Sequence, residues 1–427
     1  MDLDGQTGAL MTMHLTRRRT LASSLAIGIT ALAPIPAWAA SPELQPITKG
    51  IPPIGRAERA ARIVKAQMLM RANGIGAILI EAGSSLDYFT GIQWWRSERL
   101  TAAIIPVEGP PCIITPFFEE PSVRQALGVE ADVRVWQEDE SPIALVAAFL
   151  KARKLDRRPI GIEETVRFFA SNGLAHALPQ APIRSANPIV RGCRMIKTAA
   201  EIALMQAASD VTIAAIKHAI TRIQPGMTPA DINAMIVAAT TALGGEGDAG
   251  LVLLGEASAY PHGSQQPQRV RNRDVILIDC GCKVGGYQSD ISRTIVLGGA
   301  TDAQRKVFGH VREGQDIAMR TAQLGTPAGK VDDAVRAHYE TLGYGPRYKL
   351  PGLSHRTGHG IGMDGHEPVN LVHGEATPLA TGMCFSNEPG IYLPGQFGIR
   401  VEDCFHMTAD GPKWFSVPQT SLEYPAD

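Results

Sequence analysis

The first part of the chain alternates between short apolar runs and longer amphipathic stretches. The apolar runs are bounded by Gly and Pro, the pattern of buried strands, and comprise Ala77–Ile80, Ala102–Ile105 and Cys112–Thr115. Helical spacing of apolar residues covers Arg56–Ala72 and Ala144–Lys154. We therefore predict an α/β domain over residues 41–190, ending where Pro and Gly interrupt the pattern within Ser185–Lys197.

The second part of the chain repeats one order of elements. Thr198 begins a T-x-x-E capping box that opens a long amphipathic helix, and Thr228 caps the next helix. Strand-like segments follow, after which Thr301 begins a T-x-x-Q box and Leu324–Val335 restarts a helix. Two successive helix–helix–hairpin units predict an α+β domain over residues 191–427, built by internal duplication with pseudo-two-fold symmetry.

Two aspartates flank the first predicted hairpin. Asp279 ends the apolar run VILID, Asp290 lies in YQSDISRT, and the glycines between them allow the chain to reverse. A turn centred between Val284 and Gly285 would place the two aspartates directly opposite each other, with Cβ atoms about 5 Å apart.

Two glutamates repeat this arrangement in the second predicted hairpin. With a turn centred on Gly395, Glu388 faces Glu402. Like charges directly opposite on a sheet are destabilising, so two acidic pairs next to apolar residues require compensation. Shared protons are one solution, and cations are the other. Four carboxylates balance two divalent ions, and oxygen-rich ligation with a single imidazole suits Mn²⁺, Co²⁺, Fe²⁺ or Zn²⁺.

Six cysteines in the chain raise the question of disulfides. Cys280 and Cys282 are two residues apart in a predicted strand, too close for an easy bridge. In the second hairpin the register places Cys384 opposite His406, and Cys404 becomes a diagonal neighbour about 7–8 Å away. That separation is too large for an unstrained disulfide, so buried thiols are expected.

A glycine-rich segment, SHRTGHGIGMDGHEP, contains three histidines within a dozen residues. The four-residue spacing of His355 and His359 matches that of helical zinc motifs. Thr357, Gly358 and Gly360 disfavour a helix, however, and the glutamate of H-E-x-x-H is missing. We expect a loop that lets the backbone pass close to a crowded metal centre.

Charge and the N-terminal segment restrict the partners. The formal net charge of −1 over 427 residues gives no sign of a nucleic-acid partner. The basic stretch Thr16–Leu21 precedes a short apolar region, Leu25–Ile35, and a small-residue cleavage pattern, Ala37–Ser41. We predict that residues 1–40 are a twin-arginine export signal, giving a periplasmic or secreted protein without a stable membrane anchor.

Taken together, the motifs IDCGCKVGGYQSDISRT, HRTGHGIGMDGHEP, NEPGIY and GIRVED resemble those of the pita-bread-fold metallopeptidase family. This family includes Xaa-Pro aminopeptidases and prolidases. The part before residue 191, with LDYFTGI, resembles the creatinase/prolidase N-terminal domain. The resemblance implies an α/β N-terminal domain followed by an α+β pita-bread catalytic domain.

The resemblance also assigns roles to individual residues. It implies five ligands for two divalent metal ions, manganese first: Asp279, Asp290, His359, Glu388 and Glu402. It implies that Glu388, His262 and His366 take part in catalysis and that His355 and Arg400 bind substrate.

The implied reaction is hydrolysis of the Xaa-Pro bond, in dipeptides or at the N-terminus of short proline-containing peptides, by a metal-bridging hydroxide. A homodimer is expected. Two alternatives remain open at this point: another enzyme on the same scaffold, such as a lyase or small-amide hydrolase, and a protein that captures peptides without cleaving them.

Overall fold

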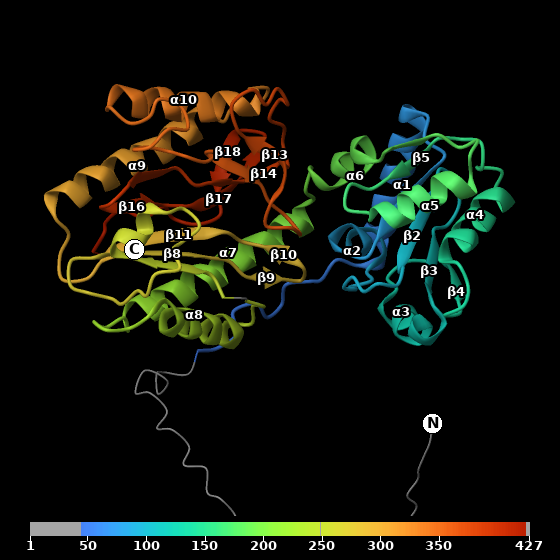
Figure 1. Ribbon diagram of the computed structural model, residues 1–427, viewed down its shortest axis with the longest axis horizontal. Coiled ribbons are helices and arrows are strands. Elements are labelled where there is room, and N and C mark those ends of the chain that lie inside the picture. Colours follow the sequence, from blue (N-terminus) through green and yellow to red (C-terminus); the bar gives the residue numbers. More distant parts are fainter. Residues whose placement is uncertain (1–43, 248, 424–427) are drawn as a thin grey trace, which may run out of the picture. The chain divides into compact units, whose positions relative to one another are not determined.

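The structure of the protein is a computed structural model that describes residues 44–247 and 249–423. The predicted export signal, residues 1–40, lies outside the described residues. The described chain falls within one compact unit, and two sets of elements follow each other along it (Figure 1).

The first set contains a mixed six-stranded sheet with the strand order β4-β3-β2-β1-β5-β6. Its strands are β1 (Ala77–Glu81), β2 (Ala102–Pro106), β3 (Cys112–Pro116), β4 (Asp132–Trp136), β5 (Ile160–Ile162) and β6 (Ile183–Ser185). The first three are buried along their whole length, which explains their uninterrupted apolar sequences. The strands predicted at these positions are confirmed, whereas β4 to β6 had no clear signal.

Helices pack around this sheet (Figure 1). They are α1 (Arg56–Asn73), α2 (Ser84–Thr90), the 3₁₀ helix η2 (Phe117–Glu119), α3 (Glu120–Ala126), α4 (Pro142–Ala152), α5 (Phe168–Ala177) and α6 (Asn187–Arg194). Helix α1 is capped at its C-terminus by Gly74, whose φ of 66° is the left-handed conformation that glycine adopts without strain. Both predicted helices are confirmed, to within two residues at each end.

The second set is a domain of two successive halves. The first half contains α7 (Ala199–Ile220), α8 (Pro229–Leu243), β7 (Leu251–Leu254), the 3₁₀ helix η3 (Gly255–Ala259), β8 (Val275–Cys280), β9 (Lys283–Val284), β10 (Tyr287–Gln288) and β11 (Ile291–Val296). The second half contains α9 (Asp302–Thr321), α10 (Ala328–Thr341), β12 (Gly358–Gly360), β13 (Glu367–Leu371), β14 (Cys384–Asn387), β15 (Gly390–Leu393), β16 (Phe397–Arg400), β17 (Asp403–Thr408) and β18 (Gly411–Trp414).

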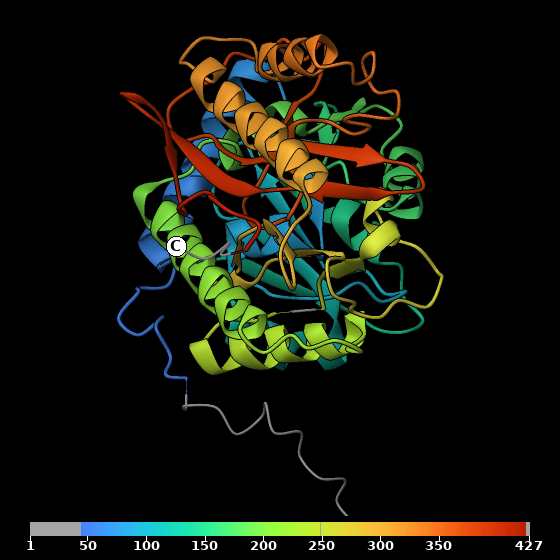
Figure 2. The same ribbon diagram turned by 90° about the vertical axis from the view of Figure 1, so that its left-hand side faces the viewer.

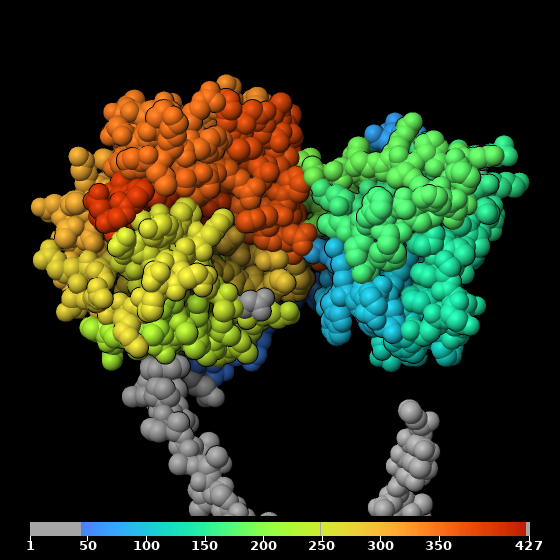
Figure 3. All heavy atoms as spheres, viewed as in Figure 1, coloured from blue at the N-terminus to red at the C-terminus, as the bar shows by residue number. Residues whose placement is uncertain are grey.

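Each half thus provides a helix pair and a strand layer. The strands of the first half form a sheet in the order β11-β8-β7, and those of the second half form one in the order β13-β12-β14-β17-β18. Two views show α7 and α8 on one side of these strands and α9 and α10 on the other (Figures 1 and 2). The halves also occupy separate parts of the domain surface, yellow-green and orange-red (Figure 3).

Capping boxes fix the starts of three of these helices. The side chains of Thr198, Thr228 and Thr301 each accept a hydrogen bond from the backbone N–H three residues later. The side chain of that later residue in turn accepts a hydrogen bond from the backbone N–H of the threonine. These are the predicted helix starts. The apolar helix α7 is long enough to cross a membrane, but 56% of its most apolar window is buried inside the protein, which is the position of a core helix.

The predicted turn centre of the first hairpin is wrong by one residue, so each residue pairs with a partner two positions away from the predicted one. Strands β8 and β11 pair Asp279 with Ser292, so the aspartates are not direct cross-strand neighbours. The turn consists of Gly285 and Gly286, with φ values of 56° and 85°. A two-residue turn of this kind requires positive φ at both central residues, and the Gly-Gly pair therefore sets the centre of the hairpin.

The predicted register of the second hairpin is confirmed. Strands β15 and β16 pair Gly390 with Arg400 about a turn at Gly395, which has φ of 75°. The same register continues in β14 and β17, where Cys384 faces His406 as predicted. All six cysteines lie among the described residues, and each is buried and unpaired.

Candidate metal centre and active site

The five predicted metal ligands converge from both halves of the domain. Asp279 lies in β8 and Asp290 directly precedes β11, while His359 is the central residue of β12. Glu388 follows β14, and Glu402 directly precedes β17. The two hairpins and the histidine strand therefore contribute side chains to one place.

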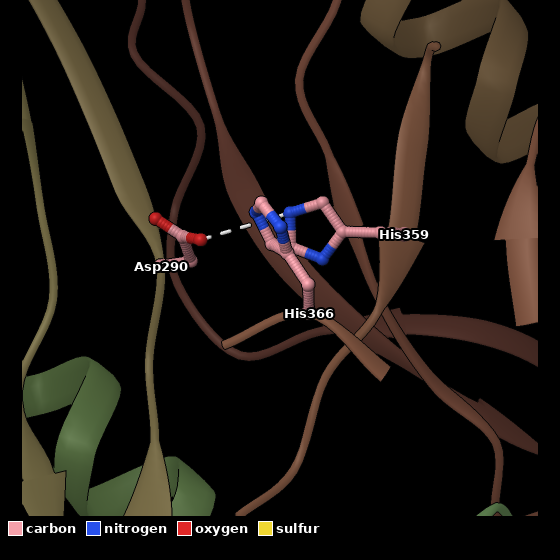
Figure 4. A group of neighbouring side chains, drawn as sticks. All are labelled: Asp290, His359 and His366. Carbon is pink, nitrogen blue, oxygen red and sulfur yellow. Dashed lines mark ion pairs between the residues drawn. The ribbon is translucent and has the colours of Figure 1, made fainter. Parts of the chain in front are cut away.

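Interatomic distances show how close these groups are. The Nε2 atom of His359 lies 3.7 Å from Oδ2 of Asp290 and 3.3 Å from Oε1 of Glu388. Figure 4 shows the rings of His359 and His366 side by side, facing the Asp290 carboxylate, with ring centroids 4.0 Å apart.

Three overlapping sets of side chains have ligand atoms within 4.8 Å of one another. They are Asp279 with Asp290 and Glu402; His359 with Glu388 and Glu402; and Asp290 with His359 and His366. Asp290, Glu402 and His359 each belong to two sets. The third set brings a predicted catalytic histidine, His366, within reach of the ligand group.

Burial and mutual repulsion dominate the electrostatics of this cluster. Burial, together with the charges of neighbouring carboxylates, raises the pKa of both Asp290 and Glu402 well above its usual range. Burial also raises the pKa of Glu388, to about 7, and lowers that of His359 to about 3. The cluster therefore disfavours its own negative charge unless a cation is present.

A second network surrounds the predicted substrate residues. The Arg400 guanidinium contacts Asp279 Oδ2 through Nη2 at 2.5 Å and the Tyr392 hydroxyl through Nη1 at 3.0 Å. The same hydroxyl lies 2.7 Å from Nε2 of His355. Burial, followed by the charge of Arg400, lowers the pKa of His355 to about 3, so its ring is neutral at pH 7. Arg400 is thus tied to Asp279, and its predicted contact with substrate stays a prediction.

His262 and His366 lie at the edge of the same centre. Burial is the main cause of the lowered pKa of both His355 and His366, and the charge of His262 adds to it. Arg400 also donates to the carbonyl of Pro261, next to His262, at 3.3 Å. His262 and His366 are both exposed, whereas His355 is half-buried.

Comparison with known proteins agrees with this architecture. Residues 203–409 match metallopeptidase family M24, and residues 62–196 match the creatinase/prolidase N-terminal domain. The probable dipeptidase PepE of Mycobacterium tuberculosis is 31% identical over 82% of this chain and 92% of its own length. The Xaa-Pro dipeptidase of Lactobacillus helveticus is 32% identical over 79% and 92%.

The chain belongs to metallopeptidase family M24. The crystal structure of dipeptidase PepE from Mycobacterium ulcerans superposes with a TM-score of 0.79 at 29% identity, covering 87% of this chain and 99% of that one. The predicted fold class, an α/β domain followed by a pita-bread catalytic domain, is confirmed by these neighbours. This M24 protein is a hydrolase, and its family implies divalent metal ions.

The donor set of this M24 metallopeptidase fits such ions. One oxygen of Glu402, Oε2, accepts a hydrogen bond of 2.8 Å from the Ser292 hydroxyl. The other, Oε1, is buried and has no hydrogen-bond donor within residues 44–247 and 249–423. A buried carboxylate oxygen without a donor is costly, and a cation ligated by carboxylates and imidazole satisfies it.

Sequence reasoning missed three residues near the M24 centre. Tyr392 joins His355 to Arg400, and Ser292 holds Glu402. The charge of Arg356 affects the pKa of Glu388 and of the neighbouring histidines. Ser292 would have been found with the correct register, because it faces Asp279. Tyr392 had no signal because its partner His355 lies 37 residues away.

Proposed function

We propose that this M24 metallopeptidase hydrolyses the bond that precedes proline, in Xaa-Pro dipeptides or at the N-terminus of short peptides. The observation that carries the proposal is the convergence of four carboxylates and one imidazole, including an unpartnered oxygen of Glu402. The relative from Lactobacillus helveticus, an Xaa-Pro dipeptidase, supports the substrate class.

Two divalent ions, with manganese as the first choice and cobalt, zinc or iron as alternatives, complete the proposed site. Five side chains would hold these ions: Asp279, Asp290, His359, Glu388 and Glu402. When bound, such ions supply Lewis-acid activation of water and of the scissile carbonyl.

The side chains of the chain itself would supply the remaining steps. Glu388 would take a proton from the attacking water and give it to the proline nitrogen, which leaves as a secondary amine. His262 and His366 would donate hydrogen bonds to the carbonyl oxygen as negative charge develops on it. His355 and Arg400 would hold the substrate, since the tertiary amide before proline has no N–H to recognise.

The test is a cleavage screen with Xaa-Pro dipeptides, Xaa-Pro-led tripeptides and matched Xaa-Ala peptides, under Mn²⁺, Co²⁺ and Zn²⁺. We expect cleavage of the proline peptides only, and loss of that cleavage in Asp290→Ala. Equal rates on dipeptides and tripeptides would indicate an aminopeptidase, and dipeptide-only cleavage a dipeptidase. Absence of cleavage with every metal would reject the proposal, as would an Asp290→Ala variant as active as the natural chain.

We also propose export through the twin-arginine pathway and assembly as a homodimer. The basic and apolar stretches within residues 1–40 support export. The family resemblance supports assembly, and Trp95, which is 84% exposed, is an aromatic side chain that a second copy would cover. Replacement of Arg17 and Arg18 by Lys should retain the protein in the cytoplasm, and light scattering of the purified protein should give twice the chain mass.

A further inference from the structure

We infer that the N-terminal domain positions His366, and that Arg194 is the residue through which it does so. Arg194 is the last residue of α6 and lies in the segment that matches the creatinase/prolidase N-terminal domain. Its role in catalysis rests on the function proposed above, whereas its role in ordering the loop before His366 does not.

The loop in question, residues 361–366, joins the histidine strand β12 to β13 and ends at His366. The Glu367 carboxylate folds back under it, and Oε1 accepts hydrogen bonds from the backbone N–H groups of Met363 (2.9 Å) and Asp364 (3.1 Å). A Cβ at Gly362 would lie 2.8 Å from both oxygens of Glu367, so the loop follows this carboxylate closely. The position of Glu367 therefore determines the position of the loop.

Arg194 connects this loop to the N-terminal domain. Its Nη2 contacts Oδ2 of Asp364 at 2.8 Å and also Oε1 of Glu367, while its Nη1 donates to the Ser85 hydroxyl at 2.9 Å. Ser84 donates to the other oxygen of Asp364. Asp364 and Glu367 are thus both bound by residues of the segment 62–196, which matches the creatinase/prolidase N-terminal domain.

The charges in this network balance. Arg194 and Lys197 face Asp364 and Glu367, and Lys197 Nζ lies 3.1 Å from Oε2 of Glu367. Glu367 and Lys197 are buried, so removing one cation leaves a buried carboxylate only partly compensated. Lysine at position 194 would keep the charge but could not reach several acceptors at once, because it lacks the planar fork of arginine.

The opposite side of the loop contacts strand β10, which leads to Asp290. The backbone N–H of Gln288 donates to the carbonyl of Gly362 at 2.8 Å, and its side chain donates to that of Met363 at 2.9 Å. Gln288 lies two residues before Asp290. A displacement of the loop would consequently move the His366 ring relative to His359 and Asp290, which Figure 4 shows facing it.

The experiment compares Arg194→Ala and Arg194→Lys with Arg191→Ala as the matched control. Arg191 lies one turn earlier on α6 and lines the same cavity of about 370 Å³, but it pairs with Glu164, and both side chains are about 40% exposed. The first readout is hydrogen exchange of residues 361–366 in the metal-loaded protein. We expect on the order of tenfold faster exchange in Arg194→Ala, partial recovery in Arg194→Lys and no change in Arg191→Ala.

The second readout is steady-state cleavage of an Xaa-Pro dipeptide, with bound metal measured in parallel. A reacting group displaced by about 1 Å can cost about 100-fold in rate, so kcat of Arg194→Ala should fall by 10- to 100-fold. KM should stay within about threefold and metal content should stay unchanged, since none of the five predicted metal ligands lies in the loop. A general loss of structure would instead lower metal content as well.

The outcomes separate this inference from the proposed function. Natural protein that cleaves no Xaa-Pro peptide rejects the function, while hydrogen exchange still tests the loop. Exchange in Arg194→Ala equal to that of the natural chain overturns the inference, as does an equal effect of Arg191→Ala. If Arg194→Ala fails to fold, the test uses Arg194→Lys. Hydrogen exchange and kcat of that variant equal to those of the natural chain would overturn the inference.

Discussion

The two hairpins that carry the acidic residues differ in how their register is set. In the second hairpin, a three-residue connection centred on Gly395 puts Glu388 and Glu402 opposite each other. Both glutamates lie between the β15–β16 pair and the β14–β17 pair, where the strand pairing is interrupted. In the first hairpin, the Gly285–Gly286 turn places Asp279 within the paired strands β8 and β11, whereas Asp290 lies in the unpaired segment between β10 and β11.

This difference reveals which positions correspond. Asp290 directly precedes β11 and Glu402 directly precedes β17, so these two carboxylates occupy equivalent sites in the two halves. Asp279 and Glu388 are not equivalent, because one lies within its strand and the other beyond it. The duplicated halves therefore supply one matched pair of ligands and one unmatched pair.

The largest expected effect tests the matched pair. Asp290→Asn and Glu402→Gln each remove a charge from the position shared by two ligand sets, and each should lower kcat/KM by on the order of 1,000-fold. Steady-state cleavage of an Xaa-Pro dipeptide measures this. Asp316→Asn, an exposed carboxylate on α9, serves as the control. If one variant loses activity and the other keeps it, the two positions are not equivalent.

The next effect concerns the buried carboxylate that each half presents to the N-terminal domain. In the first half Glu201 pairs with Arg62 at 3.4 Å, and in the second half Glu367 pairs with Arg194 and Lys197. Burial alone would raise the pKa of Glu367, but the charges of Lys197 and Arg194 lower it to about 2. The ordinary value, 4.5, is higher, so the ionised carboxylate stabilises the folded state.

This contribution is fully present above pH 4.5 and is lost as the pH falls toward 2. The difference of about 2.5 pKa units corresponds to about 3 kcal/mol in the free energy of unfolding. Urea unfolding of the natural chain and of Glu367→Gln should therefore differ by about this amount at pH 7, and the difference should shrink between pH 4.5 and 2. A difference that does not depend on pH would contradict the assignment.

Metal removal should have a slightly smaller effect on stability. A ligand that binds only the folded state adds about 2.7 kcal/mol at a concentration 100-fold above its Kd. Thermal unfolding with and without a chelator should show this gain for Mn²⁺, and neither Asp290→Asn nor Glu402→Gln should show it. An equal gain in the variants would place the binding ion elsewhere in the chain.

The smallest effect concerns the turns themselves. Gly285→Ala and Gly395→Ala both place a Cβ at positive φ, which costs about 1–2 kcal/mol in the free energy of unfolding. Only the first also meets a neighbour, since its Cβ would lie 2.9 Å from Leu204 Cδ2, whereas nothing lies within 4 Å at Gly395. Chemical denaturation should therefore rank Gly285→Ala as the more destabilised variant. Equal losses would contradict the ranking.

Local signals account for the parts of the molecule that sequence predicted. The capping threonines marked the starts of α7, α8 and α9, and the apolar runs marked β1 to β3, because these features depend on neighbouring residues only. The prediction of the register of the first hairpin was wrong because it assumed that the two aspartates face each other and gave too little weight to the Gly285–Gly286 turn. The contacts of Tyr392 with His355 and of Arg194 with Asp364 join residues 37 and 170 positions apart, and no periodicity encodes them.

The burial of every cysteine has a practical consequence. Because burial raises the pKa of Cys193 and Cys384 to about 12 and that of Cys280 and Cys404 well above its usual range, these thiols stay protonated and shielded from reagents. We therefore expect no natural cysteine of the folded protein to react with maleimide dyes. A single cysteine that replaces an exposed residue would be the one site to react, and a fluorophore there could be attached without removing any of the six natural cysteines.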